Sequence, residues 1–458
     1  MGALSFILCI AIIVGTAFLL YRKYNPQAVL IFSGLSMVAL AASIGISPVE
    51  VSKPTGTSIF DLIQIIEERF ISNFTRAGLM IMVIGGYVAF MNKIQATNAL
   101  VHIAIKPLAF FKKYPYIASI AAIPIGQLLF MTTPSAAGIG LLLVASVYPI
   151  LVNLGVSKLT ALSVISAATL FDQGPGSANT ALASQLVDMG AIEYFLKHQL
   201  PNVVPTTVIL MAVFYWNNKR CDKRDIAKGK QIFSEPMDEN QKLEVPKCFA
   251  LLPLLPLLLL IIFSDYIGLF HVKLSTTVAM LISFIFSVIC IIVYKRNIKE
   301  VFSLIGSFWQ GMGNVFATVI TLIVAAEIFS GGLISLGFID SLVSGTTTLG
   351  FSGIAISVLI TAIVFLAAML MGSGNAAFFS FGPLMPGIAA KLGMPAVQMI
   401  LPMQLAASMG RATSPIAGVI VAIAGVAGVS PMDLAKRNLL PLIVGISSLT
   451  IIHFVFGI

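Results

Sequence analysis

One arginine stands in the middle of a long uncharged part of this sequence. Arg411, in "SMGRATSP", is the only charged residue between Leu392 and Met432. A charged side chain at the centre of a bilayer costs about 3 kcal/mol or more, so such a residue usually faces a cavity or a partner. A guanidinium there can bind a carboxylate through two parallel hydrogen bonds. An internal salt bridge, or a side chain that snorkels from a helix end to the headgroups, is the alternative.

Two acidic residues are also predicted to lie at membrane depth. Asp172 lies in "FDQGPGSAN", and Glu327 lies near the end of "TVITLIVAAEIF". A buried carboxyl group can carry a proton, and carboxylate oxygens can instead help to hold a cation. Asp172 could also balance the charge of Arg411, whereas Glu327 is close enough to the end of its apolar run to be an interfacial residue.

The elements that must position these residues are helices that cross a membrane. Of the 458 residues, 58% are hydrophobic and 10% are charged, and the mean hydropathy is +1.01. This composition predicts an all-α polytopic membrane protein, because a β-barrel would show short alternating segments. The first run has Arg22 and Lys23 after it and no basic residue before it, so we expect it to span the membrane and not to be cleaved. Eight apolar runs predict ordinary transmembrane helices: 3–21, 27–46, 77–92, 198–216, 249–264, 274–293, 314–331 and 439–456.

Other features of the sequence argue against several classes of protein. A net charge of +9 can indicate a nucleic-acid or anionic partner, but in a membrane protein it more often reflects cytoplasmic loops, and we predict no nucleic-acid partner. The four cysteines and four histidines are scattered, which indicates neither a disulfide framework nor a metal site. Metalloprotease, serine-hydrolase and phosphate-loop motifs are absent, so the sequence predicts no catalytic residues and no enzyme.

Four segments carry a break near their middle. Segments 114–157 and 353–390 are uncharged and are interrupted by "MTTPSAAG" and "MGSGNAAF". Each suits a re-entrant hairpin whose tip is buried in protein, and two spanning helices joined by a tight turn are the alternative. Segments 159–187 and 397–428 contain "FDQGPGSAN" and "GRATSP". Because proline removes a helical donor and glycine relaxes the backbone, each predicts a transmembrane helix that is broken at mid-membrane depth.

The breaks supply polar groups for a candidate binding site. A half-helix that begins at a break points free N–H groups and a partial positive charge at a ligand. Ser177 and Asn179 are predicted to begin one half-helix, and Thr413 and Ser414, followed by Pro415, to begin another. The hairpin tips add Thr133, Ser135, Ser373 and Asn375. Each hydroxyl also has a structural interpretation, because Ser and Thr in membrane helices often bond to a carbonyl one turn earlier.

The two halves of the chain are predicted to be duplicates. Ser135 and Asn375 lie 240 positions apart, and two pairs of prolines with similar surroundings have the same spacing. Residues 1–230 and 240–458 then form two repeats, with a cytoplasmic linker at 217–247. If each hairpin is a non-crossing element, each half crosses the membrane an odd number of times, which inverts the second repeat relative to the first.

The distribution of basic residues supports this topology. With the 217–247 linker inside, twenty Lys and Arg fall on the cytoplasmic side, six fall outside, and Arg411 stays between. The six are Lys53, Arg69, Arg76, Lys197, Lys273 and Lys391. If only one hairpin crossed the membrane twice, this separation would be lost. Both termini are therefore expected to face the outer side.

Three strings resemble a known family. "MGSGNAAFFSFGPLMPGIAAKLG" at 371–393 and "LPMQLAASMGRATSPIAGVIVAIAGVAGVSPMDLAKRNLLP" at 401–441 resemble the DcuC-type anaerobic C4-dicarboxylate transporters. The string "PSAAGIGLLLVASVYPILVNLGVS" at 134–157 resembles the same family. The similarity covers most of the chain and is densest at 372–441. The family belongs to the wider ion transporter superfamily.

The resemblance implies a secondary carrier of succinate, fumarate, malate and related acids, acting by uptake, exchange or efflux across a bacterial inner membrane. Members of the superfamily resemble dimeric elevator carriers with two hairpins and two broken helices around one substrate. We therefore expect an elevator-type homodimer in a lipid bilayer, with both termini in the periplasm. The resemblance also implies that Arg411 and the polar residues at the breaks contact the substrate.

The coupling ion and the substrate range stay open. Asp172 and Glu327, or carbonyl groups near Gly174 and Gly372, are candidates for holding H⁺ or Na⁺, and pure exchange is a further possibility. Beyond such an ion, no cofactor is predicted. Asp172 departs from the neutral residue expected in better-known relatives. It favours an alternative, a carrier of amino acids or other small organic anions, because a carboxylate can receive an amino group.

Overall fold

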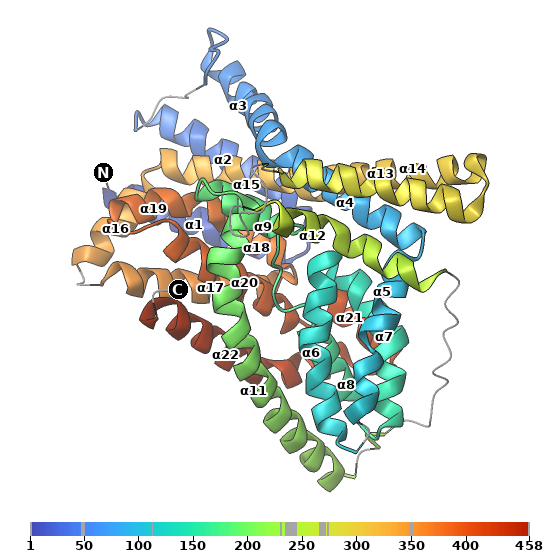
Figure 1. Cartoon of the computed structure of the whole chain (residues 1–458). Coiled ribbons are helices and arrows are strands. Elements are labelled where there is room, and N and C mark those ends of the chain that lie inside the picture. The colour runs from blue at the N-terminus through green and yellow to red at the C-terminus, as the bar shows by residue number, and fades with distance from the viewer. Residues whose placement is uncertain are drawn as a thin grey trace.

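The computed structural model describes residues 2–46, 51–111, 113–229, 231–233, 245–264, 272, 274–348 and 351–456, and every regular element in them is a helix (Figure 1). Eight helices are long and apolar enough to cross a membrane, or nine if Leu79–Lys93 and Ala96–Leu108, bent by 76°, form one span. The predicted all-α polytopic architecture is confirmed. Part of the predicted linker, together with Lys112 and Lys273 of the charge count, lies outside the described residues.

The α-helices are α1 (Gly2–Tyr21), α2 (Pro26–Ser43), α3 (Ser58–Asn73), α4 (Leu79–Lys93), α5 (Ala96–Ala104), α6 (Pro115–Thr132), α7 (Ala136–Asn153), α8 (Lys158–Ala167), α9 (Ala178–Leu186), α10 (Ala191–Tyr194), α11 (Leu200–Ala227), α12 (Leu255–Ile262), α13 (Thr276–Lys295), α14 (Ile298–Val315), α15 (Thr321–Ser335), α16 (Phe338–Thr348), α17 (Gly353–Met371), α18 (Gly374–Phe381), α19 (Met385–Lys391), α20 (Val397–Ala412), α21 (Gly418–Val426) and α22 (Pro431–Val455). Short π segments are η1 (Phe74–Gly78), η3 (Phe195–Gln199) and η5 (Phe316–Ile320), and short 3₁₀ segments are η2 (Lys106–Phe111), η4 (Lys247–Leu254) and η6 (Gly382–Leu384).

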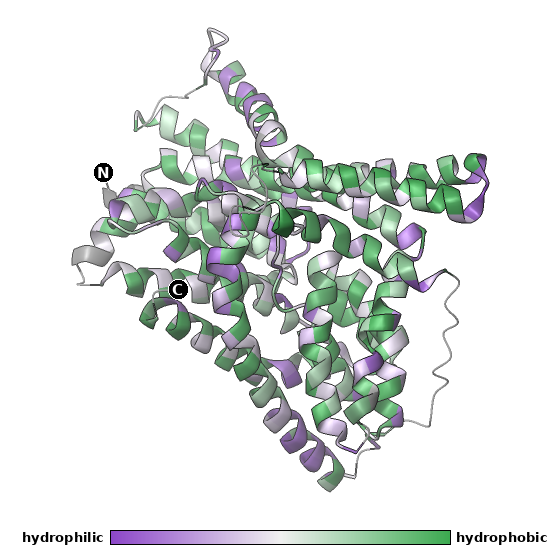
Figure 2. Ribbon diagram, in the orientation of Figure 1, coloured by the Kyte–Doolittle hydropathy of each residue, from purple (hydrophilic) through white to green (hydrophobic). Residues whose placement is uncertain are grey.

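Local sequence explains where several of these helices begin. Asn25, Ser275 and Asn297 are N-caps, and each side chain accepts a hydrogen bond from the backbone N–H three residues later. Between the caps the chain is mainly apolar, so the helix bodies are hydrophobic. Figure 2 shows hydrophilic residues gathered at the far end of α11 and at the turn between α13 and α14.

Two pairs of helices cross at glycines. A Cβ on Gly311 of α14 would stand 2.7 Å from the carbonyl oxygen of Gly85 on α4. A Cβ on Gly332 of α15 would stand 2.6 Å from the carbonyl oxygen of Gly34 on α2. Such distances leave no room for side chains, so the backbones approach closely, as is typical of helix packing in membranes.

Two amphipathic stretches, 59–70 and 297–310, continue directly into longer apolar helices. The first, in α3, continues through η1 into α4, and the second, in α14, continues through η5 into α15. The π segments insert one wide turn each and start 242 residues apart, at Phe74 and Phe316. This spacing is close to the interval of 240 seen between the polar breaks.

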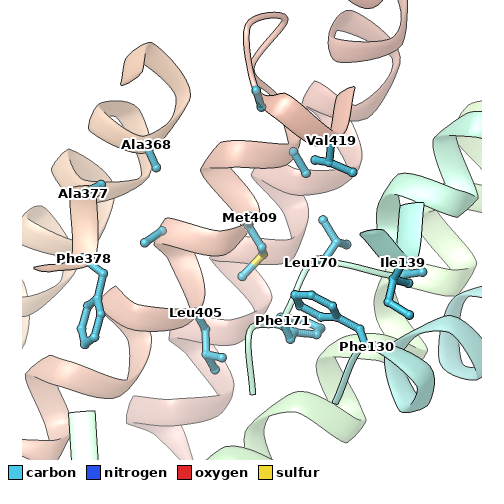
Figure 3. Packing of buried hydrophobic residues seen from close by; sticks show 14 of the residues in the cluster. Phe130, Ile139, Leu170, Phe171, Ala368, Ala377, Phe378, Leu405, Met409 and Val419 are labelled. Atoms are coloured by element: carbon cyan, nitrogen blue, oxygen red, sulfur yellow. The ribbon is translucent and has the colours of Figure 1, made fainter. Parts of the chain in front are cut away.

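All four predicted breaks interrupt helices. The first broken helix stops with α8 and resumes with α9, and the second stops with α20 and resumes with α21. Three residues, 133–135, join α6 to α7, and two residues, 372–373, join α17 to α18. The interrupted elements interlock across the two halves, because α7 packs against both α8 and α21. Figure 3 shows Leu170 and Phe171 of the first break among Leu405 and Met409 of α20 and Phe130 of α6.

The first part of the predicted linker at 217–247 is helical, because α11 runs on to Ala227. Up to that point it contains no proline or glycine to stop a helix, and one face of it is buried: Asn217, Asn218 and Asp222 are at most 6% exposed. The prediction failed because charge alone does not distinguish a loop from a helix end that packs on a polar neighbour.

Asp222 and Arg437 form a buried ion pair that the sequence did not reveal. Arg437 Nη2 lies 2.5 Å from Asp222 Oδ1. Ser157, Thr160 and Tyr116 also donate hydrogen bonds to the Asp222 carboxylate, at 2.7, 2.8 and 2.9 Å. The cluster ties α11 and α22 to α6 and to the start of the first broken helix.

Candidate functional site

A cavity of about 320 Å³ lies between α4 and α14 on one side and the interrupted helices on the other. Its polar lining consists of Asn92, Ser135, Asp172, Asn314 and Asn375. The cavity therefore brings together three predicted site residues, from the first hairpin tip, the first break and the second hairpin tip. Two of them come from the first half of the chain and one from the second.

The first break is organised around Ser177. Its Oγ accepts hydrogen bonds from the N–H groups of Asn179 and Thr180, at 3.1 and 3.2 Å, so it caps the second half-helix at the predicted place. Asn179 Nδ2 donates to Asp172 Oδ2 at 3.1 Å. Asp172 Oδ1 and Asn179 Oδ1 are buried and have no hydrogen-bond partner among the described residues. Of these two residues, Asp172 lines the cavity, whereas Asn179 is fully buried behind it in the first break.

Glycine is required at position 174. Gly174 has φ +89°, and a Cβ there would come within 2.5 Å of Met131 Cγ. Its N–H donates to Gln199 Oε1 at 3.0 Å, and Gln404 Nε2 donates to the carbonyl oxygen of Asp172 at 3.2 Å. The turn of the first break is therefore held by side chains from η3 and α20.

Arg411 lies beside the first break but is not among the residues that line the cavity. Its Nη2 donates to the carbonyl oxygen of Thr169 at 2.7 Å, and its guanidinium carbon lies 5.9 Å from the centre of the Phe130 ring. The charge of Asp172 acts on Arg411, although the two side chains form no direct ion pair in the described structure. Arg411 Nε is buried without a partner. One nitrogen thus bonds to protein, and another is available to a ligand.

The second break differs from its predicted form. Helix α21 begins at Gly418 with Ala417 as its N-cap, so Thr413, Ser414 and Pro415 precede it and do not begin it. Thr413 instead ends α20, and its hydroxyl donates to the Gly410 carbonyl at 2.7 Å. The prediction was wrong because threonine, serine and proline are also common just after a helix end, where the chain is not yet helical again. Here four residues, 414–417, separate Thr413 from the start of α21. Ser414 Oγ is buried and unpaired among the described residues.

The hairpin tips place four predicted residues at helix ends. Ser135 and Ser373 are the N-caps of α7 and α18, and each Oγ accepts one backbone N–H, at 3.3 and 3.2 Å. Thr133 Oγ1 and Asn375 Oδ1 are buried without partners in the described structure. Gly372 ends α17 with φ +69°, a conformation that favours glycine.

Glu327 is not brought to the first break. Asn73 Nδ2 donates to its Oε2 at 2.7 Å, and Arg69 Nη1 lies 4.0 Å from the same oxygen. The carboxylate therefore joins α15 to α3, and it is separate from the group formed by Asp172.

Sequence reasoning missed several polar residues at the site. Asn92 and Asn314 line the cavity from α4 and α14. Asn438 of α22 donates to Ser166 Oγ at 2.8 Å and to the Ala412 carbonyl at 3.0 Å, so it links the ends of α8 and α20. Asn92 and Asn438 each stand beside a basic residue and Asn314 follows Gln310 by four positions, so each could be taken for a residue at the polar end of a helix.

The fold is that of known membrane transporters. The YdaH transporter of Alcanivorax borkumensis superposes with a TM-score of 0.63 at 15% identity, over 95% of this chain and 99% of its own. MtrF of Neisseria gonorrhoeae superposes with a TM-score of 0.58 at 14% identity, over 96% of this chain and 97% of its own. At these identities the similarity shows the fold alone.

Sequence comparison then gives the family. Residues 4–456 match the DcuC family, described as C4-dicarboxylate anaerobic carrier. The anaerobic C4-dicarboxylate transporter DcuC of Escherichia coli K12 is 32% identical over 441 residues, 95% of this chain and 93% of the relative. A probable transporter of the same name from Vibrio cholerae is 28% identical over 451 residues, 98% of this chain and 97% of the relative. The chain belongs to the DcuC family, and its named relatives are transporters, not enzymes.

Proposed function

We propose that this protein is a secondary carrier of C4-dicarboxylates such as succinate, fumarate and malate in the inner membrane of a bacterium. The observation that carries the proposal is the convergence of unpaired buried polar atoms on the breaks of a DcuC-family chain. These atoms belong to Thr133, Asp172, Asn179, Asn375, Arg411 and Ser414. Buried polar groups are nearly always paired, so such a concentration supports a site that a polar ligand completes.

The chemistry of the breaks suits two carboxylate groups. Ser135 and Ser373 use their oxygen lone pairs to cap helices, which leaves each hydroxyl proton free to donate to a carboxylate. Arg411 can use Nε toward the ligand while Nη2 holds Thr169. The N-termini of α7, α9 and α18 add partial positive charge. Ser177 and Thr413 support the proposed site through the backbone groups that their hydroxyls bind, and the unpaired Ser414 hydroxyl can bind the ligand.

The carrier is proposed to work by an elevator mechanism. The two inverted repeats, 1–230 and 240–458, each contribute one re-entrant hairpin and one broken helix to a unit that moves against the remaining helices. The interlocking of α7 with α8 and α21 supports such a unit. The similarity of the fold to those of known transporters supports a membrane carrier. The carrier is further proposed to be a homodimer with both termini of each chain in the periplasm.

Coupling to H⁺ or Na⁺ is proposed to involve the first break. Asp172 Oδ1 and Asn179 Oδ1 are unpaired buried oxygens that a proton or a small cation can bind. The carbonyls near Gly174 and Gly372 are further candidate ligands. Glu327 is a weaker candidate, because Asn73 already binds its carboxylate.

Transport by purified protein in liposomes tests the proposal. Uptake of radiolabelled succinate is measured with unlabelled succinate inside, and then with an imposed Na⁺ or H⁺ gradient. We expect labelled succinate to exchange, and the gradient that accelerates net uptake identifies the coupling ion. Protein-free liposomes are the control. Absence of succinate, fumarate and malate transport under all three conditions would contradict the proposed function.

A further inference from the structure

We propose that the site is built for a C4-dicarboxylate that carries an amino group beside one carboxylate, an aspartate-like substrate whose ammonium group binds Asp172. This inference rests on the proposed function and narrows it. Asp172 lines the cavity, is 5% exposed, and presents Oδ1 without a partner in the described structure.

The charge of the cavity wall favours an ammonium group. Among the described residues that line the cavity, Asp172 is the only charged one, and none is basic. A plain dicarboxylate brings two negative charges to a wall that carries one more, whereas an amino dicarboxylate brings a positive charge that can be placed against the carboxylate. Arg411, the basic residue that acts on Asp172, directs Nη2 to Thr169 and forms no direct ion pair with that carboxylate.

The hydrogen-bonding groups fit the same substrate. An ammonium group has three N–H donors, and unpaired acceptors are present at Asp172 Oδ1 and at Asn375 Oδ1, which comes from the second hairpin tip. The remaining polar lining consists of Asn92, Asn314 and Ser135, whose amide and hydroxyl groups can donate to carboxylates. A volume of about 320 Å³ is at the lower end of small-molecule sites, which suits a four-carbon ligand.

A second use of Asp172 would give a different result. If the carboxyl group only takes up a proton together with a dianion, Asp172→Asn changes the pH dependence of transport. It then changes the transport of succinate and aspartate to the same extent. If it binds an ammonium group, the replacement affects the amino substrate selectively. Proton uptake and ammonium binding by Asp172 are therefore distinguished by comparing substrates that differ only in the substituent on one carbon atom.

The experiment measures uptake into proteoliposomes of labelled succinate, with unlabelled succinate, malate and L-aspartate as competitors. Malate replaces the amino group by a hydroxyl of similar size. We expect L-aspartate to compete about 10- to 100-fold better than succinate, the range for one charged hydrogen bond. In Asp172→Asn we expect the ratio of the inhibition constants of succinate and L-aspartate to fall to about that for malate, whatever the remaining rate of succinate uptake. Glu193→Gln, an exposed carboxylate paired with Lys197 four residues on, is the matched control and should behave as wild type.

Several outcomes would overturn the inference. If the wild type transports succinate and L-aspartate does not compete, the aspartate-like substrate is excluded and the dicarboxylate carrier stands. If Asp172→Asn changes both substrates equally, Asp172 is not an ammonium site. If the wild type transports neither L-aspartate nor succinate, fumarate and malate, the proposed function itself fails. Competition in the wild type decides the inference even if the variant does not fold.

Discussion

Arg411 of α20 donates a hydrogen bond from Nη2 to the carbonyl oxygen of Thr169, 2.7 Å away, just beyond the end of α8. Asn438 of α22 makes a second link between these helix ends, because its Nδ2 donates to Ser166 Oγ of α8 and to the Ala412 carbonyl of α20. Carbonyl groups at the ends of interrupted helices otherwise lack partners, and a cation beside them also complements the helix dipole. Arg411 therefore joins the two breaks in addition to its proposed contact with the substrate.

Replacing Arg411 should impair transport. Loss of a hydrogen bond from a charged group is worth about 1.5–3 kcal/mol, so Arg411→Ala should lower the rate of succinate uptake by about 10- to 100-fold. Arg411→Lys should recover part of it, since lysine keeps the charge but not the planar fork. Initial rates are compared at equal amounts of monodisperse protein. Full activity of the alanine variant would refute a role at the site.

Replacing Asn438 should destabilise the joint between the broken helices. Asn438→Ala removes the acceptor of the buried Ser163 hydroxyl and the donor to the Ala412 carbonyl, at about 1–3 kcal/mol for each group that loses its partner. Ser166 keeps its hydrogen bond to the Ser163 carbonyl. The melting temperature of detergent-purified protein should fall. Ser447→Ala removes only an exposed hydroxyl bonded within its own helix and should melt with the wild type. Equal melting of both variants would show that the link carries no stability.

The buried ion pair makes a sharper prediction. Arg437→Gln leaves the buried Asp222 carboxylate without its cation and should cost about 3–5 kcal/mol of stability. Asp222→Asn should cost less, because Asp225 Oδ2 still lies 3.9 Å from Arg437 Nη2. The double variant should cost less than the sum, because it removes both charges. Glu193→Gln breaks the exposed pair with Lys197 and should cost at most about 1 kcal/mol. Denaturant titration in detergent compares these four variants with the wild type, and additive losses of stability in the double variant would contradict the coupling.

A comparison of Gly174 with Gly155 distinguishes the cost of a left-handed backbone from the cost of a steric collision. Gly174 and Gly155 have φ +89° and +86°, but a Cβ meets Met131 only at Gly174, while Gly155 has open space around it. Both alanine variants should lose about 1–2 kcal/mol from the left-handed backbone. Gly174→Ala should in addition lose succinate transport, because the collision displaces the first break. Equal transport by the two variants would indicate that the position of this turn does not matter.

The breaks could be predicted from sequence because proline and glycine act locally. The string "FDQGPGSAN" cannot continue a helix, and in the structure α8 ends at Ala167 and α9 begins at Ala178. The exact start of α21 could not be predicted, because three small residues after Arg411 allow several turns. The hydrophobic runs indicated where most of the helices lie, but the predicted helix at 249–264 is divided into η4 and the eight-residue α12. The continuity of α14 with α15 was also not predicted, because it depends on packing.

Contacts between distant elements could not be predicted. Arg437 is one of the twenty basic residues predicted to lie on the cytoplasmic side, and nothing near it in sequence indicated an ion pair with Asp222, 215 positions earlier. The same holds for Asn92 and Asn314, which line the cavity from α4 and α14, outside the four breaks that the sequence indicated. Single polar residues in apolar runs show that a partner is needed, but they do not identify it.

Protection of the cavity by substrate tests the central claim, that Ser135 lines the dicarboxylate site. Cys9, Cys221, Cys248 and Cys290 are first replaced by serine, and Ser135→Cys is introduced, with the exposed Ser430→Cys as control. Alkylation by N-ethylmaleimide is followed in detergent with and without succinate, after each variant is shown to transport. We predict that succinate slows alkylation at position 135 and leaves position 430 unchanged. Equal alkylation at position 135 with and without saturating succinate, in a variant that still transports it, would contradict this account.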